Sequence, residues 1–287
     1  MDRGMDIRPL ENGFGSEIWG INLTKTDGAL QRELRAALLR YQVLIIREQN
    51  LSASQQLAFS KGWGPLDIHV QVKDQHPDHE EVIVLTTKMK DGKYIGAPHA
   101  GDYWHSDLSY VETPTFCTIL HAIEVAEEGG DTAFANMYRA YELLPEKTKN
   151  RIKNLRARHS YDRNINPRVA VPDTHAAVAK ERYSDRSPPP AVHPVVRTHP
   201  ETGKKALYVT ERFTLGIEEM DPELSESLLQ ELFEVASQPS NIYRHKWRKG
   251  DLVIWDNRCL MHIACGGVPK GQIRHMHRTI VRGDKPY

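Results

Sequence analysis

The sequence predicts a mainly β fold, a barrel or sandwich of strands with helices packed on the outside. Short apolar or alternating runs, typical of strands, recur along the 287 residues. Glycine, proline and aspartate separate these runs, as turns do. Only a few longer runs carry apolar residues at helical spacing. Many short strands with few helices are typical of closed or stacked sheets with helices outside.

The first third of the chain predicts a mixture of both element types. Leu30, Leu34 and Leu38 recur on one helical face, and Ser52 is a suitable helix N-cap. In chain order we expect a strand over 16–23, a helix over 28–41, a buried strand over 43–46, a helix over 52–62 and a strand over 81–88.

From residue 115 onward strands dominate. We expect strands over 115–125, 132–136, 155–159, 195–199, 207–209, 243–247, 252–255 and 273–281, with helices over 139–153 and 222–237. Residues 162–191 contain five prolines and have no clean period. We predict one domain over 1–287, with 162–191 as a lid or an insertion loop within it.

Composition excludes several classes of protein. Lys+Arg and Asp+Glu balance at 38 each, which disfavours a nucleic-acid partner bound by general phosphate attraction. No apolar run is long enough for a spanning helix, so no membrane partner is expected. The first residues lack a signal-peptide pattern and the three cysteines are too few for a disulfide scaffold. We therefore expect a cytoplasmic location.

The most informative stretch for chemistry contains His105 and Asp107. If it is a strand, these two side chains point to the same face. One imidazole and one carboxylate are two of the three ligands in the facial triad that binds iron(II). His262 is the candidate third ligand, because it follows the expected strand 252–255.

Two arginines follow His262 in the last expected strand. Arg274 and Arg278 are four residues apart and share a face, while His275 and His277 point to the other. Inward guanidinium groups are costly unless they meet anions, so the pattern indicates two anions, or one anion and a buried acid. Salt bridges from both arginines to local carboxylates are the plainer alternative.

These motifs together resemble the taurine/2,4-dichlorophenoxyacetate dioxygenase (TauD/TfdA) family of iron(II)- and 2-oxoglutarate-dependent oxygenases. The match includes His105-x-Asp107, His262, and Arg274 twelve residues later. The sequences Gly-Gly-Asp-Thr at 129–132 and Trp-Asp-Asn-Arg at 255–258 match as well. The resemblance implies a double-stranded β-helix, the jelly-roll core of cupin-like proteins.

The resemblance also implies roles for individual residues. His105, Asp107 and His262 would be the catalytic iron(II) ligands, and Arg274 with Thr132 would bind the 2-oxoglutarate cosubstrate, leaving a position for O2. Arg278 and His69 would contact the primary substrate, which Arg278 marks as a small organic anion: a sulfonate, alkyl sulfate, aryloxyalkanoate or other carboxylate. The family also implies a homo-oligomer, a dimer or tetramer.

Two departures from the taurine enzymes bear on the substrate. Gly101 replaces an asparagine and Val72 replaces a tyrosine, which favours a roomier pocket and a larger or aromatic acid. Two alternatives stay open at this point: a metal-dependent hydrolase or isomerase that uses the same triad, and a non-catalytic barrel that binds small anions. A thiolate metal site at Cys259 and Cys265 is disfavoured by their spacing.

Overall fold

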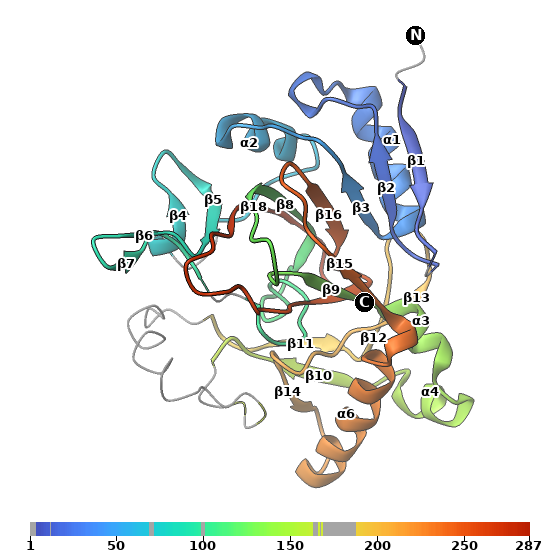
Figure 1. Ribbon diagram of the computed structural model, residues 1–287. Coiled ribbons are helices and arrows are strands. Elements are labelled where there is room, and N and C mark those ends of the chain that lie inside the picture. Colours follow the sequence, from blue (N-terminus) through green and yellow to red (C-terminus); the bar gives the residue numbers. More distant parts are fainter. Residues whose placement is uncertain are drawn as a thin grey trace.

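A computed structural model describes most of the chain (Figure 1). The described residues are 4–11, 13–68, 72–98, 101–162, 166, 168 and 188–287. Within them no helix has the length and apolar character needed to cross a membrane.

The centre of the fold is an eight-stranded, mainly antiparallel sheet. Its order is β1-β2-β3-β16-β8-β18-β5-β4, so strands from the two ends of the chain alternate in space. Their bounds are Asp6–Pro9 (β1), Ser16–Trp19 (β2), Val43–Ile46 (β3), Gln75–His76 (β4), His79–Thr86 (β5), Thr115–Glu124 (β8), Leu252–Asp256 (β16) and His275–Arg282 (β18).

A three-stranded sheet, β15-β9-β17, faces this large sheet and completes the two-layered core. Its strands are Thr132–Asn136 (β9), Ile242–His245 (β15) and Leu260–Ala264 (β17). Smaller sheets join Arg156–His159 (β10), Ala191–Pro194 (β11) and Thr214–Ile217 (β14), then Val196–Thr198 (β12) with Lys205–Leu207 (β13), and Met89–Lys90 (β6) with Lys93–Tyr94 (β7).

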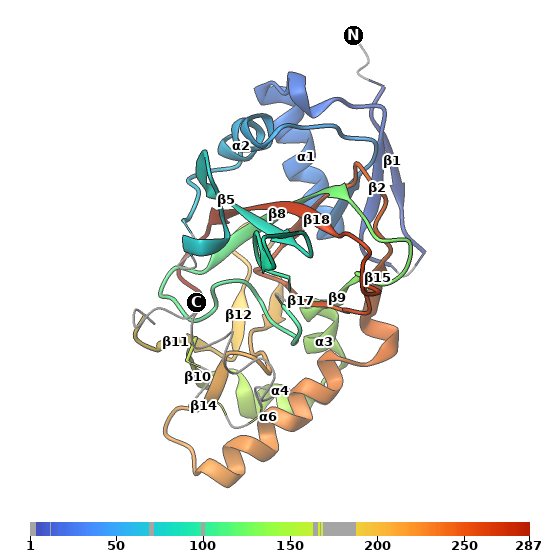
Figure 2. The ribbon, with the colours of Figure 1, turned by 60° about the vertical axis from the view of Figure 1, so that its left-hand side comes forward.

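Alternation along the central strands creates two cores. Val43 and Ile45 of β3 belong to the core between the sheets, whereas Leu44 and Ile46 belong to a second core. Because successive strand residues point to opposite faces, a continuous apolar run serves both. The second core is closed by Gly28–Tyr41 (α1) and Ala53–Lys61 (α2), and Figures 1 and 2 show both helices on one side of the large sheet.

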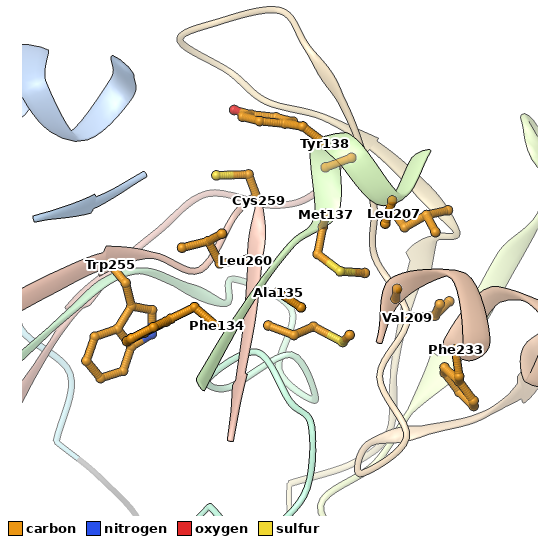
Figure 3. Close-up of a cluster of buried hydrophobic side chains, with 14 of the residues drawn as sticks. Phe134, Ala135, Met137, Tyr138, Leu207, Val209, Phe233, Trp255, Cys259 and Leu260 are labelled. Atoms are coloured by element: carbon orange, nitrogen blue, oxygen red, sulfur yellow. The ribbon is translucent and has the colours of Figure 1, made fainter. Parts of the chain in front are cut away.

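The core between the two sheets extends to helices Met137–Leu143 (α3) and Pro222–Ala236 (α6), which lie on the opposite side of the molecule from α1 and α2. Phe134 of β9 lies edge-on to Trp255 of β16, with ring centroids 5.5 Å apart (Figure 3). The same cluster continues through Met137 to Phe233. These last two residues lie on α3 and α6, respectively. The core therefore holds β9 and β16, two strands of the two facing sheets, in a fixed relation.

Local sequence signals set the helix ends. The Asp27 side chain accepts hydrogen bonds from the first turn of α1, and Gln42 ends that helix in the left-handed region. Ser52 and Gln55 form a capping box on α2, and Asp221 caps α6 ahead of Pro222. The expected helices at these three places are confirmed.

The expected helix over 139–153 is wrong as a single element. The structure has α3 and then Glu146–Ile152 (α4), with Pro145 between them. A residue before proline is disfavoured in the helical region, and Leu144 is extended with ψ 141°. Asn136, whose side chain accepts from Tyr138 and Arg139, begins α3 earlier than expected.

Other differences concern short strands. The strand expected over 195–199 is confirmed as β12, the strand expected over 207–209 lies two residues earlier as β13, and β11 was not expected. Strands β1, β14 and β17 were not expected at all. Most of the proposed lid at 162–191 lies outside the described residues, so its role stays a prediction.

A buried ion pair fixes the turn between β16 and β17, the strand that carries His262. Arg258 donates to both carboxylate oxygens of Asp256 at 2.9 and 2.7 Å, and His199 Nε2 lies 3.1 Å from Asp256 Oδ2. Burial alone would raise the pKa of Asp256, but Arg258 and His199 hold it well below the ordinary value of 3.8. The pair therefore stabilises the folded state while Asp256 is ionised.

We expect Asp256→Asn to lower the free energy of unfolding by about 3 kcal/mol at pH 7, since Arg258 keeps its contact with Glu201 but loses the buried carboxylate that it binds through two nitrogens. A carboxyl with a lowered folded pKa stabilises above its unfolded pKa, and this stabilisation is lost as the pH falls. The difference from wild type should therefore shrink below about pH 4 in urea denaturation. Asp78→Asn, at an exposed turn position, is the control and should change little.

Candidate active site

Two histidines far apart in the sequence are joined by their backbones. His105 N donates to His262 O at 3.0 Å, and His262 N donates to His105 O at 2.8 Å. His262 lies in the middle of β17, and His105 pairs with it as an isolated bridge. Their imidazole centroids are consequently 4.1 Å apart. The reciprocal bonds fix the spacing of the two rings.

Asp107 completes the cluster. Its Oδ1 lies 3.7 Å from His105 Nε2, and its Oδ2 lies 3.8 Å from His262 Nε2. One donor atom from each residue lies within 4.8 Å of the others, and all three residues are buried. Three ligand atoms at these separations can bind one metal ion.

The reason for this convergence differs from the one expected. His105 and Asp107 do not lie in a regular strand: the bridge ends at His105, and Asp107 lies in a turn followed by Leu108 at φ 53°. The turn, rather than strand alternation, directs the carboxylate toward the imidazoles. His262 likewise lies inside its own strand, not at the end of the strand that contains Trp255.

The charge state of the three ligands suits a cation. Burial, reinforced by His105, lowers the pKa of His262 to about 3, so its ring is neutral near pH 7. Burial by itself would raise the pKa of Asp107, but His262, Arg278 and His105 hold it well below its usual range. His105 Nδ1 lies 2.7 Å from the Tyr103 carbonyl, which can only accept, so Nδ1 donates there and Nε2 is the nitrogen that faces Asp107.

Arg274 is a partly buried cation next to Gly130, just before β9. Its Nε donates to the Gly130 carbonyl at 3.2 Å, and within the described residues no carboxylate forms an ion pair with it. Burial lowers its pKa to about 10. Gly130 makes this contact possible, because its φ is +71° and a Cβ there would lie 2.9 Å from Arg274 Cδ. A desolvated guanidinium of this kind suits an incoming carboxylate.

Thr132 and Arg278 lie close to these groups. Thr132 is the first residue of β9, two residues after Gly130, and its hydroxyl accepts from Trp247 Nε1 at 3.0 Å. Arg278 Nη1 is 3.5 Å from Asp107 Oδ1, so Arg278 borders the triad directly. Its buried Nε has no hydrogen-bond partner among the described residues.

The structure supports the expected substrate contacts of His69, Gly101 and Val72 less than it supports the metal ligands. His69 lies outside the described residues, so its contact with substrate stays a prediction. A Cβ on Gly101 would lie 3.0 Å from His105 Cε1, so only glycine leaves this ring undisturbed. Val72 is 71% exposed and a Cβ at Gly101 would crowd His105, so the roomier pocket stays a prediction.

Sequence reasoning missed several residues that contact the triad. Thr118 donates to Asp107 Oδ2 at 2.6 Å, and Asn257 contacts both Thr118 and Asp107. The Trp255 ring packs on His262 and the Phe213 ring on His105, with centroids 4.7 and 5.8 Å apart. The local signals for this set were the Trp-Asp-Asn-Arg motif, which contains Trp255 and Asn257, and the polar Thr118 in a largely apolar buried strand.

A second group of ligand-type side chains serves a different purpose. His199, Asp256 and Cys259 also converge. Arg258 occupies both oxygens of Asp256, and burial raises the pKa of the Cys259 thiol well above its usual value. This group is part of the ion pair that fixes the β16–β17 turn.

The site combines two imidazoles and one carboxylate with the Arg274 guanidinium at the start of β9, which has no ion pair among the described residues. Such a donor set is typical of non-haem iron(II) oxygenases, in which three further metal positions stay open for cosubstrate and dioxygen. The arginine beside it favours a cosubstrate with a free carboxylate over the hydrolase or isomerase alternative.

Comparison with known proteins agrees with this class. The family described as "Taurine catabolism dioxygenase TauD, TfdA family" matches residues 6–280. The chain is 36% identical to an (S)-phenoxypropionate/alpha-ketoglutarate-dioxygenase of Sphingobium herbicidovorans, over 92% of this chain and 90% of that protein. It is 33% identical to an alpha-ketoglutarate-dependent 2,4-dichlorophenoxyacetate dioxygenase of Cupriavidus pinatubonensis, over 88% and 90%.

A solved structure shows the same fold. The crystal structure of a putative alpha-ketoglutarate-dependent taurine dioxygenase from Burkholderia xenovorans superposes with a TM-score of 0.81 and 31% identity, over 99% of this chain and 94% of that one. This chain belongs to the TauD/TfdA family. It is an iron(II)- and 2-oxoglutarate-dependent dioxygenase with a jelly-roll core, and these expectations from the sequence are confirmed.

Proposed function

We propose that this protein hydroxylates an aryloxyalkanoate at the carbon that bears the ether oxygen. The two relatives described above are named for phenoxypropionate and 2,4-dichlorophenoxyacetate, and this chain aligns with each over most of its length. Sulfonates and alkyl sulfates are the competing anions. The product of the proposed reaction is a hemiacetal, which would collapse to a phenol and a 2-oxo acid.

In this proposal His105, Asp107 and His262 hold the iron(II). Arg274 binds the far carboxylate of 2-oxoglutarate, with the Thr132 hydroxyl nearby. The observation that carries this assignment is the partly buried Arg274 guanidinium, which has no counter-ion among the described residues. An unpaired buried cation is costly, so the site is built for an anion that arrives with the cosubstrate.

When bound, the iron(II) supplies the oxidation of a C–H bond by O2, with 2-oxoglutarate giving succinate and CO2. One oxygen atom enters succinate and the other enters the product, so the reaction balances. The chain's own task is to hold the substrate carbon near the metal and to exclude water. The Phe213 and Trp255 rings, which pack on the two histidines, limit water access to that position.

The substrate end of the site combines charge and apolar surface. Arg278, whose Nε has no hydrogen-bond partner in the part of the chain that the structure describes, can reach a carboxylate beside the triad. Phe213 packs edge-on against His105 and offers an aromatic neighbour for an aryl ring. The Gly101 backbone lies close to the same imidazole, so a side chain at that position would press on the ring. His69 is proposed as a second polar contact to the substrate.

The test is a screen of succinate release over phenoxyacetates, phenoxypropionates, alkyl sulfates and sulfonates including taurine. We expect turnover with the aryloxy acids and phenol as a product. Anaerobic addition of iron(II) and 2-oxoglutarate should give a weak visible charge-transfer band before any substrate is added. Arg278→Ala should raise the KM of the aryloxy acid more than that of 2-oxoglutarate.

The two parts of the proposal can fail separately. Turnover of taurine alone would overturn the aryloxy assignment while leaving the metal centre intact. Absence of the visible band, with correctly folded protein, would overturn the assignment of His105, Asp107 and His262 as iron ligands.

Four further expectations stay predictions. We propose a single domain over 1–287, a homo-oligomer, a cytoplasmic location and no nucleic-acid partner. The family match over residues 6–280 supports the single domain, and the balanced charge of the chain supports the absence of a nucleic-acid partner. Size-exclusion chromatography with light scattering measures the oligomeric state directly.

A further inference from the structure

The asparagine of the Trp-Asp-Asn-Arg motif contacts the back of the triad. Asn257 is buried in the turn between β16 and β17. Its Oδ1 accepts from the Asp107 backbone N–H at 3.1 Å and from Trp255 Nε1 at 3.2 Å. Both partners can only donate, so the orientation of the Asn257 amide is fixed with Nδ2 on the opposite side.

This orientation decides which way Thr118 donates. Asn257 Nδ2 donates to Thr118 Oγ1 at 2.9 Å. A hydroxyl has one proton, and since Oγ1 accepts from Asn257, that proton goes to Asp107 Oδ2 at 2.6 Å. The chain of donors therefore runs in one direction, from Asn257 through Thr118 to Asp107.

The carboxylate needs such support because the sheet does not supply it. His105 and His262 are fixed by their reciprocal backbone bonds, whereas Asp107 lies beyond that bridge in a turn. Within the described residues its backbone N–H is bound by Asn257 and its Oδ2 by Thr118. Its Oδ1 has only longer contacts, to Arg278 at 3.5 Å and His105 at 3.7 Å.

We propose that Thr118 and Asn257 are positioning residues that hold the Asp107 carboxylate in the orientation that metal binding requires. The inference rests on the proposed function of the triad as the metal site. With Oδ2 held by Thr118, the carboxylate cannot rotate, and Oδ1 is presented beside the two imidazoles. Partners of this kind raise metal affinity because the ligand does not lose rotational freedom on binding.

The experiment measures Mn(II) binding to metal-stripped full-length protein by the EPR signal of free Mn(II), with no turnover required. Thr118→Val keeps the side-chain shape and removes the hydroxyl, and we expect the affinity to fall about 10- to 100-fold. Thr118→Ser restores the hydroxyl and should restore binding. At saturating metal, Thr118→Val should recover most of its kcat, because the defect lies in binding.

Thr279→Val is the matched control. Thr279 is a fully buried threonine of the neighbouring strand β18, and its hydroxyl contacts Ser60 instead of the triad. Its Mn(II) affinity should equal that of wild type. If Thr118→Val does not fold, Asn257→Leu tests the same hydrogen bonds, because it removes the amide that contacts Thr118 and Asp107. This variant should also bind Mn(II) more weakly than wild type.

Folded Thr118→Val that binds Mn(II) as wild type does would overturn the proposal. The proposal would also be overturned if Thr118→Ser fails to restore Mn(II) affinity, or if Thr279→Val loses as much Mn(II) affinity as Thr118→Val. A different result marks failure of the metal site itself: wild type and His262→Ala would then bind Mn(II) equally weakly.

Discussion

Asp107→Ala is expected to abolish succinate formation. Asp107 is the one carboxylate of the triad, and the two remaining ligands are imidazoles. Its loss removes both a ligand and the negative charge that offsets the metal. It also leaves Arg278 Nη1, 3.5 Å from the carboxylate in the wild type, as an uncompensated positive charge next to the metal position. Each effect opposes binding of a divalent cation.

Succinate release and Mn(II) binding measured on the same preparation would check this result. Asp67→Ala is the control, since Asp67 pairs with Arg282 at the surface and lies outside the triad. It should keep wild-type rates. A substantial rate in Asp107→Ala would show that the metal is held elsewhere, and with it the assignment of His105 and His262 would fall.

Arg274→Ala should raise the requirement for 2-oxoglutarate strongly. Truncating one partner of a buried charge pair costs about 2–5 kcal/mol, which corresponds to a rise in KM of roughly 30- to several-thousand-fold. The loss should concern 2-oxoglutarate and leave Mn(II) affinity unchanged, because Arg274 is not a metal ligand. Arg274→Lys keeps the charge but loses the planar fork, so an intermediate effect is expected.

Arg244→Ala, on strand β15, is the control for Arg274→Ala. Arg244 is 57% exposed and pairs with Asp131, next to the glycine that Arg274 contacts. Its removal should alter KM little, since exposed ion pairs contribute weakly. An unchanged KM for 2-oxoglutarate in Arg274→Ala would remove this residue from the cosubstrate site and require another cation for the distal carboxylate.

Much of the fold follows from local patterns. The apolar run 43–46 became a strand because four successive apolar residues can serve the two cores that flank a buried strand. Asp27, Ser52 and Asp221 cap the helices that the spacing predicts. The strand β17 was not predicted because its five residues are too few to show the alternation of apolar and polar side chains that marks a strand. Its partner β9 also lies far away in the sequence.

The candidate site was predicted with a partly wrong reason. His105 and Asp107 were paired by strand alternation, yet a bridge and a turn bring them together. Arg278 was expected to face a substrate anion, and it also contacts Asp107, a relation that spacing along β18 cannot reveal. Thr118 and Asn257 had no assigned role, because their contacts join strands separated by more than a hundred residues.

The sequence by itself determined the class of chemistry. The chemistry of a side chain is set by its residue type and does not depend on the fold. Two histidines, one aspartate and an arginine therefore limit the metal ligands and anion-binding groups that this chain can offer. Only the tertiary structure decided which oxygen of Asp107 is held by Thr118, which nitrogen of His105 is bound to a carbonyl, and that no carboxylate in the described part of the chain pairs with Arg274. Those outcomes depend on directions and distances between strands that are distant in sequence, and hydrogen bonds and charge pairs are governed by such directions and distances.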